Sequence, residues 1–366
     1  MIKTVYTKLW RPVLFRQDPE VVHDRFVKLG VMFGRFSVTR GILSFFFNYK
    51  NKMLESRVAG IKFQNPIGLA AGFDKDARLT SVLPSIGFGY EEIGSITGTE
   101  CPGNPKPRLW RLPKDKGLMI NYGLKSKGSR IIAKELHGRK FKFPVGVSIA
   151  RANNSDIIMD IKKGIADYIK GINNLKEIGD YITINISCPN TPENQAFSTC
   201  ENFKLLMEAL DNEEIDKPLF IKMKPDLSEP EIDRFIEICD QYKFVTGFIV
   251  TNLTKDRERL KTEPEKLALM KGSASGAVLQ EKSNSMIKYM YSRTRGRYVL
   301  IGVGGIFNAS DAYTMIKNGA SLLQLVTGMI YKGPTCISDI NKGLVRLLKK
   351  DGYKNISEAV GQNHAK

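Results

Sequence analysis

The sequence predicts an α/β protein, a (β/α)8 TIM barrel with an N-terminal helical extension. From about residue 60 onward, short apolar runs alternate with longer amphipathic stretches, which is the pattern of βα units around a parallel sheet. Eight such runs can be counted, and eight strands alternating with helices close a barrel. The 366 residues, of which 42% are apolar and 26% charged, suffice for one barrel and an appendage. The predicted strands span residues 66–71, 90–96, 144–149, 181–187, 218–223, 247–252, 298–304 and 322–327.

Helix signals occupy two of the segments between these strands. Ser228 is placed as the N-cap of a helix over 229–242, and Glu201 opens a helix over 201–210. Between the second and third strands lies instead an irregular piece, residues 98–128, rich in Pro and Gly. Insertions of this length are usually lids or binding loops, and we expect one here.

The segment before residue 58 is predicted to be a separate helical module. Asp18-Pro19-Glu20 is typical of a helix start, with proline at the first helical position and an acid in the first turn. Apolar residues then recur at near-helical spacing, and a second apolar patch covers residues 42–47. We therefore divide the chain into an amphipathic N-terminal module (1–57), a barrel (58–350) and a polar C-terminal tail (351–366).

The net charge of +18 is concentrated near the N-terminus, where residues 1–57 carry eleven Lys and Arg against four Asp and Glu. These cations flank the apolar faces, as in helices that lie in the headgroup region of a membrane. A helix pair packed on the barrel explains the same periodicity, so both interpretations stay open. Nucleic-acid binding is not expected, because no RNA or DNA module signature accompanies the charge.

The cysteines form an odd set with no Cys-x-x-Cys spacing, which argues against disulfides and against a zinc or iron–sulfur site. No metal is expected, and a reducing compartment is implied. The apolar run 42–47 is far shorter than the roughly 20 residues of a spanning helix, and early acidic residues argue against a signal peptide. The five cysteines are Cys101, Cys188, Cys200, Cys239 and Cys336.

Polar residues and glycines follow most of the predicted strands, at the barrel end where active sites form. Gly304 and Gly305 would let the backbone approach a phosphate, next to Gly328. Lys222 ends an apolar strand and would be costly to bury without an anionic or polar partner. The candidates are Lys75, Thr97, Ser148, Asn185, Cys188, Asn190, Lys222, Thr251, Asn252, Gly304, Gly305, Thr327 and Gly328.

The most specific stretch is 184–192, in which Cys188 lies between Asn185 and Asn190. A thiol set between two carboxamides at a barrel mouth can serve as a proton acceptor. The alternative is an ordinary buried cysteine that behaves as a small hydrophobe, and these residues alone favour it.

Several ordered motifs resemble the dihydroorotate dehydrogenase family, from about residue 18 to residue 334. Asp18-Pro19-Glu20 with His23 resembles the membrane-associated, quinone-using class of that family. The other matching stretches are residues 65–76 (NPIGLAAGFDKD), 103–108 (GNPKPR), 187–190 (SCPN), Lys222 with 225–228 (PDLS), 251–252 (TN) and 302–306 (GVGGI).

The resemblance implies an FMN-dependent oxidoreductase of the EC 1.3 class that oxidises (S)-dihydroorotate to orotate in pyrimidine biosynthesis. By position, the implied FMN site comprises Ala71, Gly72, Lys75, Thr97, Ser148, Asn185, Lys222, Thr251, Gly276, Gly304, Gly305, Thr327 and Gly328. The implied substrate site comprises Lys75, Asn121, Tyr122, Gly123, Leu124, Asn185, Asn190 and Asn252, and the quinone side His23 and Arg111.

The chemistry implied by the resemblance is removal of a proton from substrate carbon 5, with hydride passing from carbon 6 to flavin N5. The base position holds Cys188, where the membrane-associated class typically has serine and the soluble class has cysteine. A thiol with a reference pKa near 8.5 is a better base than a hydroxyl. If Lys75 lies close, we expect it to move the pKa of this thiol below that reference value.

The chain departs from the family pattern near the expected substrate and quinone. Ser148 replaces an asparagine, Leu253 a substrate-facing threonine and Val326 a tyrosine on the quinone side. The Asn121-Tyr122-Gly123 turn is one residue tighter than usual, and residues 191–199 lack a Gly-Leu-Arg pattern.

The expected partners are dihydroorotate and orotate, a membrane quinone and an anionic membrane surface, with the enzyme peripheral on the cytoplasmic face of the inner membrane. Two alternatives stay open. One is a related FMN oxidoreductase with another cyclic imide substrate or a soluble acceptor such as fumarate. The other is a non-catalytic, membrane-associated barrel, since fold alone does not fix function.

Overall fold

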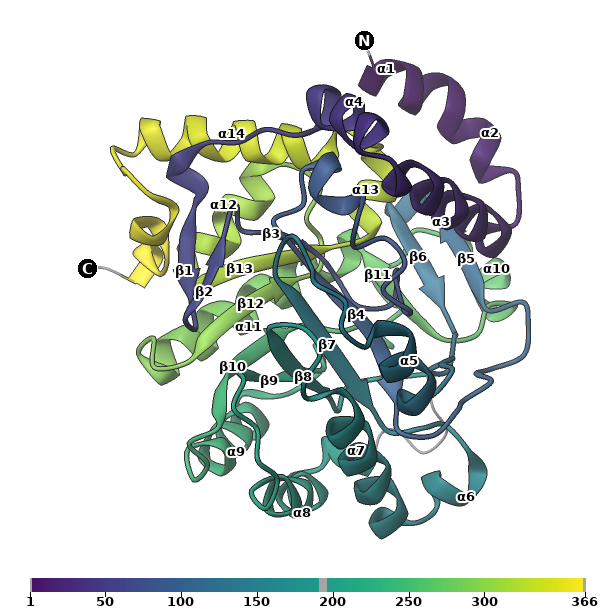
Figure 1. Cartoon of the computed structure of the whole chain (residues 1–366), viewed down its shortest axis with the longest axis vertical. Coiled ribbons are helices and arrows are strands. Elements are labelled where there is room, and N and C mark those ends of the chain that lie inside the picture. Colours follow the sequence, from purple (N-terminus) through teal and green to yellow (C-terminus); the bar gives the residue numbers. More distant parts are fainter. Residues whose placement is uncertain (1, 191–195, 365–366) are drawn as a thin grey trace.

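Eight parallel strands form a closed barrel in the computed structural model, which describes residues 2–190 and 196–364 (Figure 1). The strands follow one another around the ring in chain order, and the last pairs with the first, Leu323 beside Ile67. Each predicted strand overlaps an observed one, so the barrel prediction is confirmed. The barrel strands are β3 (Ile67–Leu69), β4 (Tyr90–Thr97), β7 (Val145–Ala150), β8 (Tyr181–Asn185), β9 (Leu219–Met223), β10 (Val245–Val250), β12 (Val299–Val303) and β13 (Ala320–Leu325).

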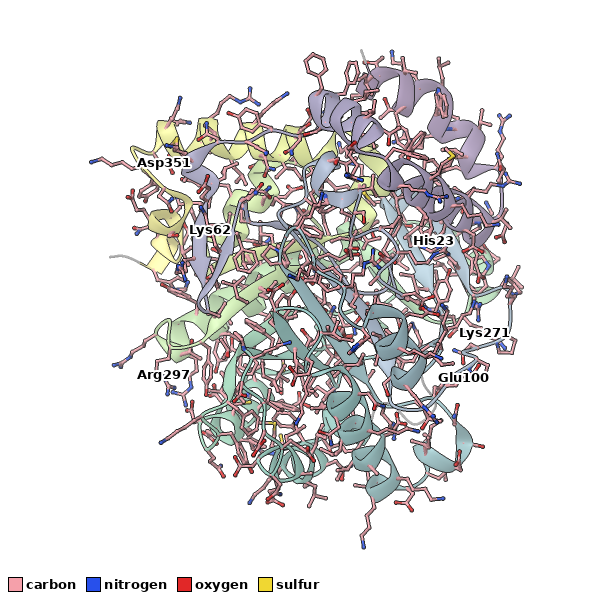
Figure 2. All side chains as sticks on the ribbon, in the orientation of Figure 1. His23, Lys62, Glu100, Lys271, Arg297 and Asp351 are labelled. Carbon is pink, nitrogen blue, oxygen red and sulfur yellow. The ribbon has the colours of Figure 1, made fainter. Side chains whose placement is uncertain are left out.

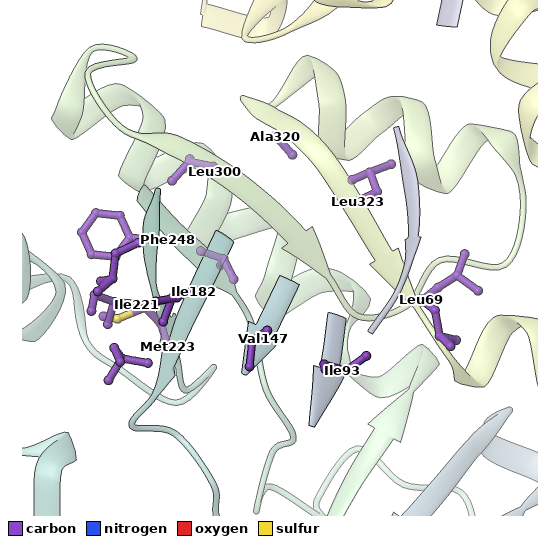
Figure 3. Packing of buried hydrophobic residues seen from close by; sticks show 14 of the residues in the cluster. Leu69, Ile93, Val147, Ile182, Ile221, Met223, Phe248, Leu300, Ala320 and Leu323 are labelled. Atoms are coloured by element: carbon purple, nitrogen blue, oxygen red, sulfur yellow. The ribbon is translucent and has the colours of Figure 1, made fainter. Parts of the chain in front are cut away.

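Apolar side chains from strands and surrounding helices form the main core. Figure 3 shows members of this core that lie on the barrel strands, such as Ile93 and Val147. The strands also supply a second cluster that includes Tyr90, Tyr181 and Phe220, and the hairpin of β1 (Ser56–Val58) and β2 (Ile61–Phe63) packs against it. Side chains two residues apart on a strand point the same way. Glu92, Thr183 and Lys222 follow Tyr90, Tyr181 and Phe220 by two residues. They therefore point the same way as these aromatic residues and lie nearer the carboxyl ends of the strands.

Helices surround the barrel, and side chains cap the starts of α7, α8, α9 and α12. Ser228 caps its helix as predicted, because its N–H and hydroxyl both donate to the Glu231 carboxylate at 2.8 and 2.7 Å. That helix ends at Cys239, three residues earlier than predicted. The helices are α5 (Ser129–Leu136), α6 (Ser155–Ile158), α7 (Ile161–Leu175), α8 (Cys200–Leu210), α9 (Glu229–Cys239), α10 (Pro264–Ala268), α11 (Gln280–Thr294), α12 (Ala309–Lys317), α13 (Thr327–Lys332) and α14 (Cys336–Lys350).

The N-terminal module is helical and lies on one side of the barrel (Figure 1). Asp18 caps α3 by accepting from the Val21 N–H at 2.9 Å. Large apolar side chains of the module remain exposed, including Trp10 at 61% and Phe45 at 83%. Among the described residues, no helix is both long and apolar enough to cross a membrane. The module comprises α1 (Ile2–Val5), the π-helix Tyr6–Trp10, α2 (Arg11–Phe15), α3 (Pro19–Arg35) and α4 (Ser37–Phe47).

The insertion 98–128 is more regular than expected. Its strands β5 (Leu109–Leu112) and β6 (Gly117–Ile120) form an antiparallel sheet with β11 (Ser273–Gly276). The sequence did not reveal this sheet, because its three strands are each four residues long and β11 lies about 150 residues from β6 in the chain.

The C-terminal segment folds back onto the barrel rather than extending from it as a polar tail. Ile356 and Ala359, in a short 3-10 turn, are fully buried in the main core. His364 stacks on Tyr291 of α11, with 4.9 Å between ring centroids.

Candidate active site

The floor of the site is a buried ion pair inside the barrel. Lys222 Nζ on β9 lies 3.3 Å from Glu92 Oε1 on β4, and both side chains are at most 5% exposed. Glu92 also accepts hydrogen bonds from Gln324 at 2.9 Å and Thr183 at 3.2 Å. The anionic partner that a buried Lys222 requires is therefore supplied by the chain itself.

Asn185, at the end of β8, is the hub of the next polar layer. Its Nδ2 donates to Ser95 Oγ at 2.7 Å, and Ser95 Oγ lies 2.8 Å from Ser148 Oγ. Its Oδ1 accepts from the Ser187 hydroxyl at 3.0 Å, and Asn252 Nδ2 donates to that hydroxyl, also at 3.0 Å. Three predicted site residues from β7, β8 and the end of β10 are thus joined in one network.

Asn104 joins two further predicted residues. Its Nδ2 donates to Asn121 Oδ1 and to the backbone oxygen of Asn190, each at 3.0 Å. Asn190 is itself buried, and its Oδ1 has no hydrogen-bond partner among the described residues. A buried acceptor without a partner is costly, so this oxygen is suited to a ligand donor.

Cys188 is half-buried, next to these carboxamides. Burial raises the pKa of its thiol, although the Asn190 backbone N–H and the charges of Lys75 and Arg151 favour the thiolate. The expectation that Lys75 moves this pKa below the usual value is therefore wrong, since desolvation outweighs the nearby charges.

Lys75 is close enough to influence Cys188, and its own charge is weakened. Burial, followed by the charges of Arg108 and Lys125, lowers the pKa of Lys75 to about 8. Its Nζ lies 4.1 Å from the centre of the Tyr122 ring. Lys75 therefore changes charge near neutral pH.

Tyr122 is stacked between two cations, because the Arg108 guanidinium lies 5.0 Å from the same ring. Arg108 in turn forms a bidentate pair with Glu20 of α3, at 2.8 and 3.2 Å, and both side chains are buried. The start of α3 is thereby attached to the wall of the site.

Glycine backbone forms the opposite wall. Gly305 has φ of +72°, and a Cβ there would lie 2.4 Å from Gln280, so a side chain is excluded. Gly72 has φ of +107°, and nothing lies within 4 Å of the position of its missing Cβ. The backbone at Gly72 therefore borders open space, as a cradle for a planar or phosphate-bearing group would. Added Cβ atoms at Gly276, Gly304 and Gly328 would likewise lie 2.0–2.7 Å from neighbouring atoms.

The remaining predicted residues lie around this frame. Thr251 Oγ1 contacts Ser283 at 3.0 Å, and Thr327 Oγ1 contacts Ser275 at 2.9 Å. The Thr97 N–H donates to Ser126 at 3.2 Å. Ala71 is half-buried, the Gly123 oxygen accepts from Cys101 at 3.5 Å, and Leu124 packs on the Cys101 cluster. Residues 191–195, which contain most of the stretch lacking Gly-Leu-Arg, are outside the described part of the chain.

His23 and Arg111 link the N-terminal module to the barrel. His23 on α3 (Figure 2) lies 2.8 Å from the Phe73 oxygen through Nε2, and its ring stacks edge-on against Phe73. Arg111 on β5 donates to the Gln17 oxygen at 2.6 Å. Within the described part of the chain, no hydrogen bond or ring contact joins His23 to Arg111.

Sequence reasoning missed the residues that hold these groups in place. Glu92 carried a usable signal, since a glutamate inside a predicted buried strand needs a partner. Asn104 and Arg108 lay in a recognised motif but were given no role. Ser187 also lay in a recognised motif without a role, and Ser95 had no distinguishing signal.

Comparison with known proteins identifies the family. The family model described as dihydroorotate dehydrogenase matches residues 53–348, so the chain belongs to the dihydroorotate dehydrogenase family. It is 35% identical over 376 residues to the dihydroorotate dehydrogenase (quinone) of Trichodesmium erythraeum, covering 98% of each chain. It is 38% identical over 327 residues to that of Crocosphaera subtropica, covering 87% of this chain and 85% of the relative.

Solved structures agree with this assignment. The crystal structure of DHODH from Eimeria tenella in complex with ferulenol is similar, with a TM-score of 0.82, 27% identity and full coverage of both chains. The ligand-free enzyme from the same organism gives a TM-score of 0.83 and 29% identity, covering 95% of this chain and 99% of the other.

Proposed function

We propose that this chain oxidises (S)-dihydroorotate to orotate in pyrimidine biosynthesis and passes the electrons to a membrane quinone. The observation that carries the proposal is the frame of four carboxamides, Asn121, Asn185, Asn190 and Asn252, beside Cys188 and Lys75. Dihydroorotate is a cyclic imide with a carboxylate. Its ring edge suits carboxamide donors and acceptors, and its carboxylate suits the Lys75 ammonium.

FMN is the flavin that this site would hold. The open cradle at Gly72 and the crowded Gly304-Gly305 backbone support a bound phosphate-bearing group, and Lys222 would supply a cation to the flavin. When bound, FMN accepts the hydride released from carbon 6 of the substrate.

Cys188 is the proposed base for the proton on carbon 5. Asn185 and Asn190 flank it and would fix the substrate ring, so that this proton faces the sulfur. The Ser187–Asn185–Asn252 hydrogen bonds restrain the backbone on which Cys188 stands. The ammonium of Lys75 would hold the carboxylate and favour the thiolate electrostatically.

The N-terminal module is proposed to hold the enzyme at the cytoplasmic face of an anionic membrane and to receive the quinone beside His23 and Arg111. Its exposed apolar side chains and surplus of cations support this role.

Anaerobic mixing of the purified protein with dihydroorotate tests the reaction. Flavin absorbance should bleach, and orotate should form with a short-chain quinone as acceptor. Failure of dihydroorotate to reduce a bound flavin would refute the substrate assignment. Faster turnover with fumarate than with quinone would refute the acceptor.

A further inference from the structure

A small pocket away from the site described above is lined by an unusual number of cations. Arg40, at the beginning of α4, meets Arg139, Lys140 and Lys142 from the segment between α5 and β7, with Thr80 and Ser81 beside them. Its volume of about 70 Å³ is several times the ~10–15 Å³ that one water molecule requires. The pocket can therefore hold a polyatomic ion.

The two arginines are fixed in place by neutral acceptors. Arg139 donates to the Ala77 oxygen at 2.8 Å and to Thr80 Oγ1 at 2.7 Å, while Arg40 donates to the Gly34 oxygen at 2.6 Å. Carbonyl and hydroxyl oxygens orient a guanidinium without neutralising it. Each guanidinium has five N–H donors, so several remain for a ligand.

No carboxylate among the described residues lies within 4 Å of these four cations. Glu91, whose pKa the charge of Arg139 lowers, is fully buried and forms no ion pair with it. Burial, followed by the charge of Asp74, raises the pKa of Glu91 well above its usual range. Four uncompensated positive charges in one hollow favour an anion.

We propose that this pocket binds a phosphate group and, through it, ties α4 to the barrel. Paired guanidinium groups suit phosphate oxygens geometrically, and Ser81 adds a hydroxyl donor. The backbones are already close at this junction, since a Cβ on Gly34 would lie 3.4 Å from the Ser81 side chain. Inorganic phosphate, a soluble phosphate ester and a phospholipid headgroup all present this chemistry.

The test uses full-length enzyme loaded with FMN and saturated with orotate, so that the flavin and substrate sites are occupied. The pocket variant is Lys140→Gln with Lys142→Gln. The matched control is Lys162→Gln with Lys163→Gln, exposed lysines on α7 that remove the same charge. Inorganic phosphate binding is measured by calorimetry at constant ionic strength, and lipid binding by sedimentation with phosphatidylglycerol and phosphatidylcholine vesicles.

Wild type and the control should bind phosphate, and the pocket variant should bind on the order of tenfold more weakly. If none of the three proteins binds inorganic phosphate, but the pocket variant alone no longer sediments with phosphatidylglycerol vesicles, the pocket binds a lipid headgroup. If neither probe separates the pocket variant from the control, the proposal is overturned. Dihydroorotate oxidation does not enter these measurements, so this result is independent of the proposed reaction.

Discussion

Replacement of Cys188 is the sharpest perturbation of the proposed reaction. Cys188→Ala removes the thiol that lies between Asn185 and Asn190 in the sequence, while the contacts described for the glycine cradle do not involve it. Loss of a side-chain base typically costs about 10²- to 10⁴-fold in rate. Flavin should therefore stay bound, and its reduction by dihydroorotate should slow by that factor.

The pH dependence follows from burial of the thiol. Burial raises the pKa of the Cys188 thiol above its ordinary value, which favours the protonated thiol over the thiolate. Only the thiolate accepts the proton, so the reduction rate should rise about tenfold per pH unit up to the raised pKa. Cys188→Ser, with a hydroxyl of far higher pKa, should be slower and show no plateau in this range.

Anaerobic stopped-flow measurement of flavin absorbance, with saturating dihydroorotate at each pH, reads this step directly. Cys200→Ser is a matched control, because Cys200 is a half-buried thiol at the start of α8. A wild-type rate that levels off below the usual thiol pKa, or an alanine variant as fast as wild type, would refute the role of Cys188.

Three further outcomes are expected. Because the pKa of Lys75 is lowered to about 8, the Kd for dihydroorotate should rise above that pH, and Lys75→Arg should remove the rise. An unchanged wild-type Kd would count against Lys75 as the carboxylate ligand. Glu92→Gln should lower the free energy of unfolding by about 3–5 kcal/mol in urea titrations, since it leaves Lys222 buried without a carboxylate. Adding Lys222→Met should recover part of that stability, and a loss under about 1 kcal/mol would contradict the prediction. Phe45→Ser with Trp10→Ser should weaken binding to phosphatidylglycerol vesicles while leaving flavin reduction unchanged. Equal vesicle binding by the variant and the wild type would favour a module that only packs on the barrel.

The barrel was predictable because each of its strands is a short apolar run, and side chains on both faces of those strands are buried. The sheet of β5, β6 and β11 was not, since its pairing joins Gly117 to Gly276 across the chain and no local pattern encodes that distance. The C-terminal segment was misjudged for a related reason. Many of its residues are polar and face solvent, whereas two apolar residues, Ile356 and Ala359, are buried in the core and fix the position of the segment.

The candidate site was predictable to the extent that it sits at strand ends and in recognised motifs. Asn185, Ser148 and Asn252 were named from sequence and are joined in the structure. The electrostatics were not predictable, because the pKa of Cys188 depends on how far burial outweighs Lys75, and burial is a three-dimensional quantity. The role of Glu92 was not predicted from the sequence, since its ion-pair and hydrogen-bond partners come from three other strands.

The N-terminal module contacts the wall of the candidate site directly. Three contacts lead from α3 to the substrate side: Glu20 pairs with Arg108, Arg108 stacks on Tyr122, and Tyr122 stacks on Lys75. Arg108 also lowers the pKa of Lys75, so the position of α3 affects the charge of that ammonium. Tyr122 therefore contacts both the arginine that is paired with α3 and Lys75, at 5.0 and 4.1 Å from its ring centre.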